Sequence, residues 1–189
     1  MSKFLDDMAE KKQSQKLLKI LTDLNSEDAK KISKAVKSLE AHGDSRVIKP
    51  LVKRLLKGVE GKNEKEIIEL LSSLKDTSTV VEIMDVLGDK EFLPIRQKVL
   101  TTIWNTKVDF SDYIDEFVEI AVEGDFMEAL DCLTIIENLE GPFMEENILE
   151  SQLHLKNYLE KNLARDNQKA HIISEIALLI KEIDMNLMD

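Results

Sequence analysis

The stretch that decides the fold is DTSTVVEIMDVLGDKEFLPIRQKVLTTIWNTK, residues 76–107. Its first part carries apolar residues at spacings i, i+3, i+4 and i+7, the pattern of a helix that packs one face on a core. These residues are Val80, Ile83, Met84 and Leu87. A Gly88-Asp89 turn follows, and Pro94 stands where the first position of a second helix is expected. The stretch therefore predicts two helices joined by a turn.

The same apolar pattern recurs along the chain at a nearly constant interval. One set of predicted helices begins its pattern at residues 32, 67, 96 and 129, and a second set begins at 48, 80 and 114. A helical unit that returns every 30–35 residues or so is typical of an α-solenoid. We therefore expect an all-α fold, a right-handed α-solenoid of about 9–10 helices. No segment shows the strict alternation of a half-buried strand.

The same repeat spacing also divides the stretch 76–107 between two repeats. Counted from residue 32, Val80–Leu87 closes one repeat and Pro94–Trp104 opens the next, so the Gly88-Asp89 turn is interpreted as a joint between repeats. The whole chain, 1–189, is predicted to be one domain. Residues 1–27 are expected to form an N-terminal capping helix, 28–141 the hairpins and 142–189 the C-terminal capping helices, because terminal repeats are usually atypical.

One motif resembles a known family. The run Gly43-Asp44-x-Arg46-x-Ile48-x-Pro50-Leu51, and Leu87-Gly88-Asp89 followed by Ile95-Arg96, are similar to the bacterial HEAT repeats also called PBS-lyase-like. The likeness covers roughly residues 28–140. It implies a buried Asp/Arg ladder, although Ala129 stands at the arginine position of the fourth pair. Members of the family serve as scaffolds, adaptors, nucleic-acid enzymes and chromophore lyases, so the resemblance does not select one function.

Charge is distributed unevenly along the chain. The net charge is −11, yet residues 1–62 carry 15 Lys and Arg against 9 Asp and Glu, while the remainder carries 11 against 28. Such polarity bears on partners and not on fold. The first residues lack the apolar segment of a signal peptide, and no run is long enough to span a membrane. With a single cysteine, Cys132, we expect a cytoplasmic bacterial protein without a membrane partner.

No residue pattern indicates catalysis, a metal or a cofactor. His42, His154 and His171 have no Cys or His at the spacing of zinc ligands. Cys132 lies in an apolar stripe, where a free cysteine is usually a small core residue. We therefore expect no cofactor, no metal and no enzymatic activity.

Two charged series are candidate binding surfaces. Lysines recur on single helical faces at 30, 34 and 37 and at 49, 53 and 57, so Lys34, Lys49 and Lys53 are candidates for a phosphate-binding stripe. Asp112 and Glu116 form a like-charge pair at i, i+4, which weakens a helix unless the charge has another use. A solvated surface is the alternative explanation for both series.

Aromatic residues gather in the middle third of the chain. Trp104 and Tyr113 are candidate anchors for a partner, because buried aromatics dominate interface energies. Packing between repeats is the alternative. Their neighbours in the sequence are Phe92, Phe110, Phe117 and Phe126.

The function that these observations favour is a non-enzymatic scaffold that binds a protein partner of unknown identity. One alternative is nucleic-acid binding through the basic N-terminal face. A further alternative, a chromophore-lyase-like enzyme, follows only from the family resemblance. Self-association of the basic N-terminal end with the acidic remainder of another copy also stays open.

Overall fold

The computed structural model describes residues 15–42, 45–59, 61–106, 108–162 and 168–187. After a helix over residues 15–24, the α-helices are α2 (Ala29–His42), α3 (Ile48–Leu56), α4 (Lys62–Ser72), α5 (Thr79–Gly88), α6 (Arg96–Ile103), α7 (Ile114–Glu123), α8 (Phe126–Glu137), α9 (Glu145–Asn162) and α10 (Gln168–Leu187). Short 3₁₀ helices precede three of them: η1 (Ser45–Val47), η2 (Lys90–Ile95) and η3 (Ser111–Tyr113). These ranges contain no strand, which confirms the all-α prediction.

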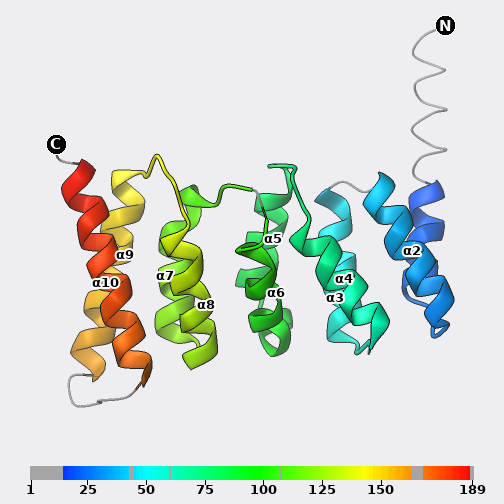
Figure 1. Ribbon diagram of the computed structural model, residues 1–189. Helices are drawn as coiled ribbons and strands as arrows, with labels where there is room; N and C mark the ends of the chain where they lie inside the picture. Colours follow the sequence, from blue (N-terminus) through cyan, green and yellow to red (C-terminus); the bar gives the residue numbers. More distant parts are fainter. Residues whose placement is uncertain (1–14, 43–44, 60, 107, 163–167, 188–189) are drawn as a thin grey trace, which may run out of the picture.

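The helices stand in a row of antiparallel hairpins. Figure 1 shows α3 beside α4, α5 beside α6, α7 beside α8 and α9 beside α10, in chain order from right to left. Neighbouring hairpins pack in two layers. One layer follows the contacts from α2 through α4, α6 and α8 to α10, and the other includes the contacts α3–α5 and α7–α9.

The stretch 76–107 folds as a single hairpin, since α5 packs against α6 across η2. The division of this stretch between two repeats was therefore wrong. The spacing of apolar stripes gives the distance from one helix to the next in its layer, but it does not show which neighbour closes the hairpin. The turn itself is built by burial of Phe92 and Ile95 in η2, whose first turn is capped by the Asp89 carboxylate.

The predicted apolar stripes form one continuous core. All four stripe residues are buried in each of α2, α3, α5 and α7. Pro94 differs from expectation, because it lies inside η2 and not at the first position of α6. The Gly43-Asp44 part of the family motif lies outside the described residues.

Polar contacts between successive helices recur at nearly the same spacing as the apolar stripes. Partners lie 32–34 residues apart in Ser33–Glu66, Ala29–Asn63, Glu64–Lys98, Arg96–Glu128, Gln97–Asp131 and Gln152–Asp184. These contacts tie each helix of the α2-to-α8 layer to the next one, and the last joins α9 to α10.

The C-terminal helices extend the row. Helix α9 packs on α7, and α10 packs on α8 and α9. Within the described ranges, no helix is both long and apolar enough to cross a bilayer.

Candidate functional site

Carboxylates from three neighbouring helices meet on one side of the row. One side of α7 is buried and includes Ile114, Phe117 and Val118, so the positions between these residues face solvent. The residues exposed or half-buried in this way, together with electrostatic neighbours on α5 and α9, are named here the acidic face. Its members are Asp85 of α5, Asp115, Glu116 and Glu119 of α7, and Glu150 of α9.

Two members of the acidic face have raised pKa values. Partial burial is the main cause of the raised pKa of Glu116, and the neighbouring charges of Asp115, Glu119 and Asp85 raise it further. Partial burial also raises the pKa of Asp115, where hydrogen bonds from backbone N–H groups and the nearby His154 act in the opposite direction. The fold thus holds these carboxylates where ionisation is less favourable than in water.

No ion pair with Lys or Arg neutralises the acidic face within the described residues. The cationic partners go to other carboxylates, in Lys49–Asp89, Lys53–Glu91, Lys62–Glu66, Arg96–Glu128 and Lys98–Glu64. Among the described residues, Glu150 of the acidic face lies 3.7 Å from His154, one turn away on α9. The acidic face therefore keeps most of its negative charge uncompensated.

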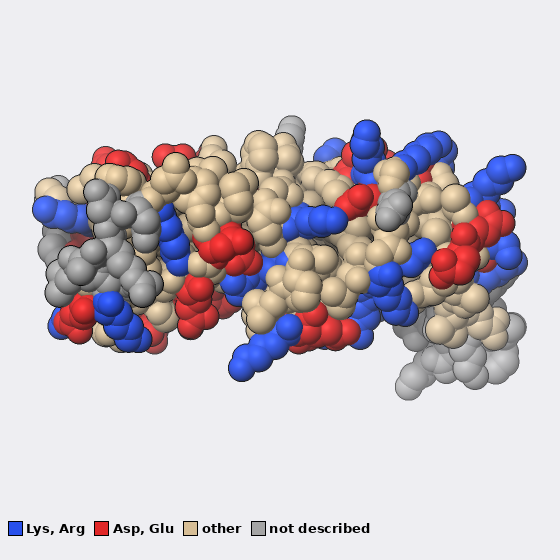
Figure 2. All heavy atoms as spheres, turned by 90° about the horizontal axis from the view of Figure 1, so that it is seen from below, with Lys and Arg blue, Asp and Glu red and all other residues tan. Residues whose placement is uncertain are grey.

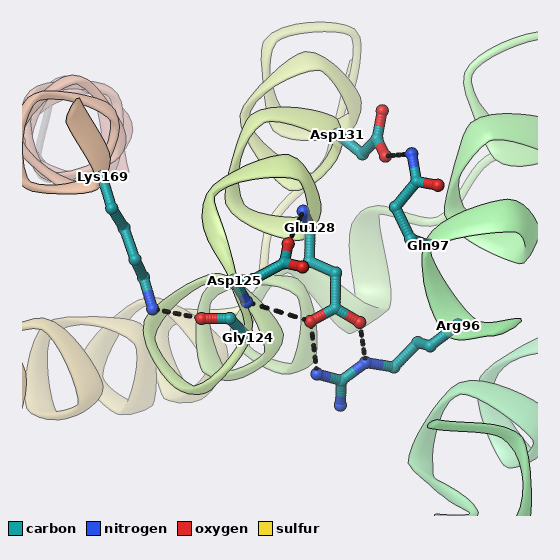
Figure 3. A network of polar contacts seen from close by, with 7 residues as sticks. All are labelled: Arg96, Gln97, Gly124, Asp125, Glu128, Asp131 and Lys169. Atoms are coloured by element: carbon teal, nitrogen blue, oxygen red, sulfur yellow. Dashed lines mark hydrogen bonds and ion pairs between the residues drawn. The ribbon is translucent and has the colours of Figure 1, made fainter. Parts of the chain in front are cut away.

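A second polar cluster, drawn in Figure 3, surrounds the tight turn between α7 and α8. Glu128 accepts two hydrogen bonds from the Arg96 guanidinium, at 2.7 and 2.9 Å, and both side chains are about 11% exposed. Glu128 also accepts from the Asp125 backbone N–H, and Asp125 accepts from that of Glu128, which completes a capping box for α8. The hydrogen bonds that Arg96 donates to the Glu128 carboxylate raise the pKa of Arg96.

The same turn is held from the other side by Lys169 of α10. Its ammonium donates to the carbonyls of Val122 and Gly124 at the C-terminal end of α7, where a cation is favoured. It also lies 5.4 Å from the centre of the Tyr158 ring. We call Arg96, Asp125, Glu128 and Lys169 the hairpin clamp. Each of its charges has a hydrogen-bond partner, so the clamp is a structural device, and partial burial lowers the pKa of Lys169.

The described residues contain no group of His, Cys, Asp and Glu able to hold a metal ion. Cys132 is buried, and burial raises the pKa of its thiol, which opposes formation of a nucleophilic thiolate.

The predicted basic stripe is split by the structure. Lys34 lines a groove of about 540 Å³ on α2 together with Lys16, Lys30 and Lys37. Lys49 instead pairs with Asp89 at 3.3 Å and lies over the Phe92 ring, while Lys53 pairs with Glu91 at 3.6 Å. The three lysines therefore do not form one free cationic surface. Figure 2 shows both signs interspersed on one face of the molecule, with Lys and Arg more numerous toward the N-terminal end.

The remaining candidates lie around the connection between α6 and α7. Trp104 is 48% exposed at the end of α6, and Tyr113 is half-buried in η3. Asp112 is exposed beside Tyr113, and Glu116 lies one turn further along α7 within the acidic face. Of the other aromatics, Phe92, Phe110 and Phe117 are core residues, as the packing alternative predicted.

Sequence reasoning missed the hairpin clamp and the acidic-face members outside α7. A signal for the clamp was present, because Asp125-x-x-Glu128 is a capping-box pattern. The approach of Lys169 to α7, and of Asp85 and Glu150 to the α7 carboxylates, depends on which helices become neighbours, and no local pattern carries that information.

Comparison with protein-family models, with curated proteins and with solved structures finds no match for this chain.

Proposed function

We propose that this chain is a HEAT-like, right-handed α-solenoid that acts as a non-enzymatic scaffold in the bacterial cytoplasm, and that its acidic face binds a basic segment of a protein partner. The solenoid assignment is supported by the row of hairpins, the two packing layers and the polar contacts that recur every 32–34 residues. Stacked hairpins of this kind present long surfaces along which a partner can lie.

The observation that carries the proposal is the uncompensated charge around Glu116. Half-buried carboxylates beside one another reduce the stability of the fold, and each would be relieved by an incoming Lys or Arg. A cationic segment therefore gains electrostatic energy there that the chain itself does not supply.

Exposed apolar side chains lie close to these carboxylates along the sequence. Val81 precedes Asp85 by one turn on α5, and Leu149 and Leu153 flank Glu150 on α9. Each of the three is about half exposed. A partner segment that mixes Lys or Arg with aliphatic residues matches this combination, because apolar contacts supply affinity and charge supplies orientation.

The test is binding of a fluorescent peptide that combines lysine and leucine residues. The double variant Glu116→Lys/Glu119→Lys should weaken binding at least about tenfold relative to the wild type. The matched control is Glu69→Lys/Glu137→Lys, which makes the same change in net charge at exposed positions of α4 and α8. Equal weakening by both pairs, or no binding by the wild type at low salt, would contradict the proposal.

Nucleic-acid binding is the second candidate, and the observation that favours it is the lysine groove on α2. Among Lys34, Lys49 and Lys53, Lys34 is the one that faces this groove, so the sequence-based version loses two of its three contacts to Asp89 and Glu91. Charge reversal of Lys34 and Lys37 should then abolish single-stranded DNA binding and its salt dependence. The absence of DNA binding by the wild type at low salt would exclude this candidate.

A further inference from the structure

The last hairpin of the row carries an unusual share of exposed apolar side chains. Elsewhere in the described ranges such residues occur singly, as with Leu18, Leu93 and Met127. On α9 and α10 they gather, and four of them are 49–61% exposed. The residues are Leu149, Leu153, Leu159, Leu178, Met185 and Leu187. Grouped exposed apolar residues mark an interaction surface more often than scattered ones do.

Between the two helices lies a groove of about 390 Å³. Leu155, Leu159, Ala177 and Ile180 provide its apolar lining. The polar side chains around it are Gln152, Lys156, Glu160 and Lys181. We call these eight residues the end groove.

The end groove occurs where the stacking of hairpins stops. Helices α7 and α8 are covered by α9 and α10, but Figure 1 shows no described element beyond the α9–α10 hairpin. Terminal repeats of stacked helical proteins need a polar outer face to remain separate in solution. The end groove instead has an apolar lining in which Leu159 is 49% exposed, so a covering partner is expected.

We propose that the end groove is a homodimer interface, in which two copies meet through their α9–α10 hairpins about a two-fold axis. A two-fold axis sets a patch against its own copy, so the patch must be complementary to itself. The end groove meets this requirement because Lys156 and Lys181 accompany Glu160, and none of the three has an ion pair among the described residues. Each copy can offer lysines to the glutamate of its partner.

The alternative is stacking head to tail, in which the end groove meets the opposite end of the row in another copy. The other end of the row is the helix over residues 15–24, where Lys16 and Lys19 accompany the exposed Leu18. That contact would place lysines beside Lys156 and Lys181 but also beside Glu160, Glu175 and Glu182, and it would continue beyond two copies. The two-fold contact thus differs from the association of a basic end with an acidic remainder that the net charges alone favour.

The experiment is sedimentation velocity on the full chain over a wide concentration range. Leu159→Glu should raise the dimer dissociation constant at least about tenfold, since it places a charge in the apolar lining. The control is Leu93→Glu in η2, because Leu93 and Leu159 are almost equally exposed, at 48% and 49%. The wild type and the control should remain dimeric.

A charge exchange tests the two-fold pairing directly and does not depend on the folding of Leu159→Glu. Lys181→Glu should weaken the dimer, and the double exchange Lys181→Glu/Glu160→Lys should restore it. A wild type that stays monomeric at every concentration, species that grow beyond two copies, equal dissociation of the Leu93→Glu control, or a double exchange that fails to restore the dimer would each overturn the proposal.

Discussion

Glu128 and Glu116 lie on helices of the same hairpin but in opposite surroundings. Glu128 is almost buried, and its carboxylate accepts hydrogen bonds from the Arg96 guanidinium and the Asp125 backbone. Glu116 is half-buried, and the charges that shift its pKa are those of Asp115, Glu119 and Asp85, all negative. The difference separates two uses of acidic residues in one chain: the hairpin clamp holds the row together, whereas the acidic face leaves its charge for a partner.

The largest effect is expected from breaking the clamp. Glu128→Ala leaves the Arg96 guanidinium poorly solvated and without its counter-charge, and it removes half of the α8 capping box. We expect the free energy of unfolding to fall by about 3 kcal/mol. Urea denaturation measures this free energy. The control is Glu137→Ala, at an exposed position of the same helix, which should change the free energy of unfolding by less than about 0.5 kcal/mol. Equal losses of stability in the two variants would contradict the claim that the hairpin clamp stabilises the fold.

A smaller loss is expected at the turn that the clamp encloses. A Cβ at position 124 would collide with the Glu128 carboxylate and would lie 2.7 Å from the Ile120 carbonyl oxygen. Gly124→Ala should therefore lower stability by about 2 kcal/mol. Gly88→Ala is the matched control, because a Cβ there meets no atom within 4 Å. Thermal unfolding measures both variants. If Gly124→Ala is as stable as Gly88→Ala, the turn can move away from the Glu128 carboxylate.

The third change removes the ammonium of Lys169, the member of the hairpin clamp that lies on α10. Lys169→Met keeps much of the length of the side chain but deprives the Val122 and Gly124 carbonyls of their donor. A loss of about 1 kcal/mol follows from one charged contact at a helix end. Urea denaturation should show no comparable loss for Lys65→Met, whose side chain is exposed on α4. Equal losses would mean that the Lys169 contact adds nothing to stability.

The smallest effect has the opposite sign and concerns the acidic face. Glu116→Gln removes like-charge repulsion, so stability at neutral pH should rise by about 0.3 kcal/mol. Partial burial and the neighbouring carboxylates raise the pKa of Glu116 in the folded protein. The cost of its charge to stability is therefore absent below the ordinary glutamate value of 4.5, grows between 4.5 and the folded pKa, and is complete above the folded pKa. The gain should therefore vanish in acid. A loss of stability at neutral pH would contradict the description of this face.

Much of the fold is contained in the sequence. The stripes at Ile32, Ile48, Val80 and Ile114 each predicted a helix that the structure contains, because burial of one face every 3.6 residues is a local property. Hairpin pairing was wrong because it depends on η2, whose Phe92 and Ile95 fold the chain back on α5. Nothing in a spacing count reveals that turn.

The candidate site was less predictable. The sequence shows carboxylates crowded around the start of α7, at Asp112 in η3 and Glu116 in α7, and the raised pKa of Glu116 agrees with this. By contrast, Lys49 and Lys53 looked free because their partners Asp89 and Glu91 are about 40 residues away along the chain. Whether a charge is compensated is decided by packing, so composition alone could not distinguish the two series.

The most direct test of the account is the pKa of Glu116, measured by nuclear magnetic resonance of its side-chain carboxyl carbon, without and with the lysine–leucine peptide. We expect a pKa above the ordinary 4.5 in the free protein and a fall when the cationic peptide binds. A free value at or below 4.5, or a raised value that the bound peptide leaves unchanged, would contradict the claim that this face is held for a basic partner.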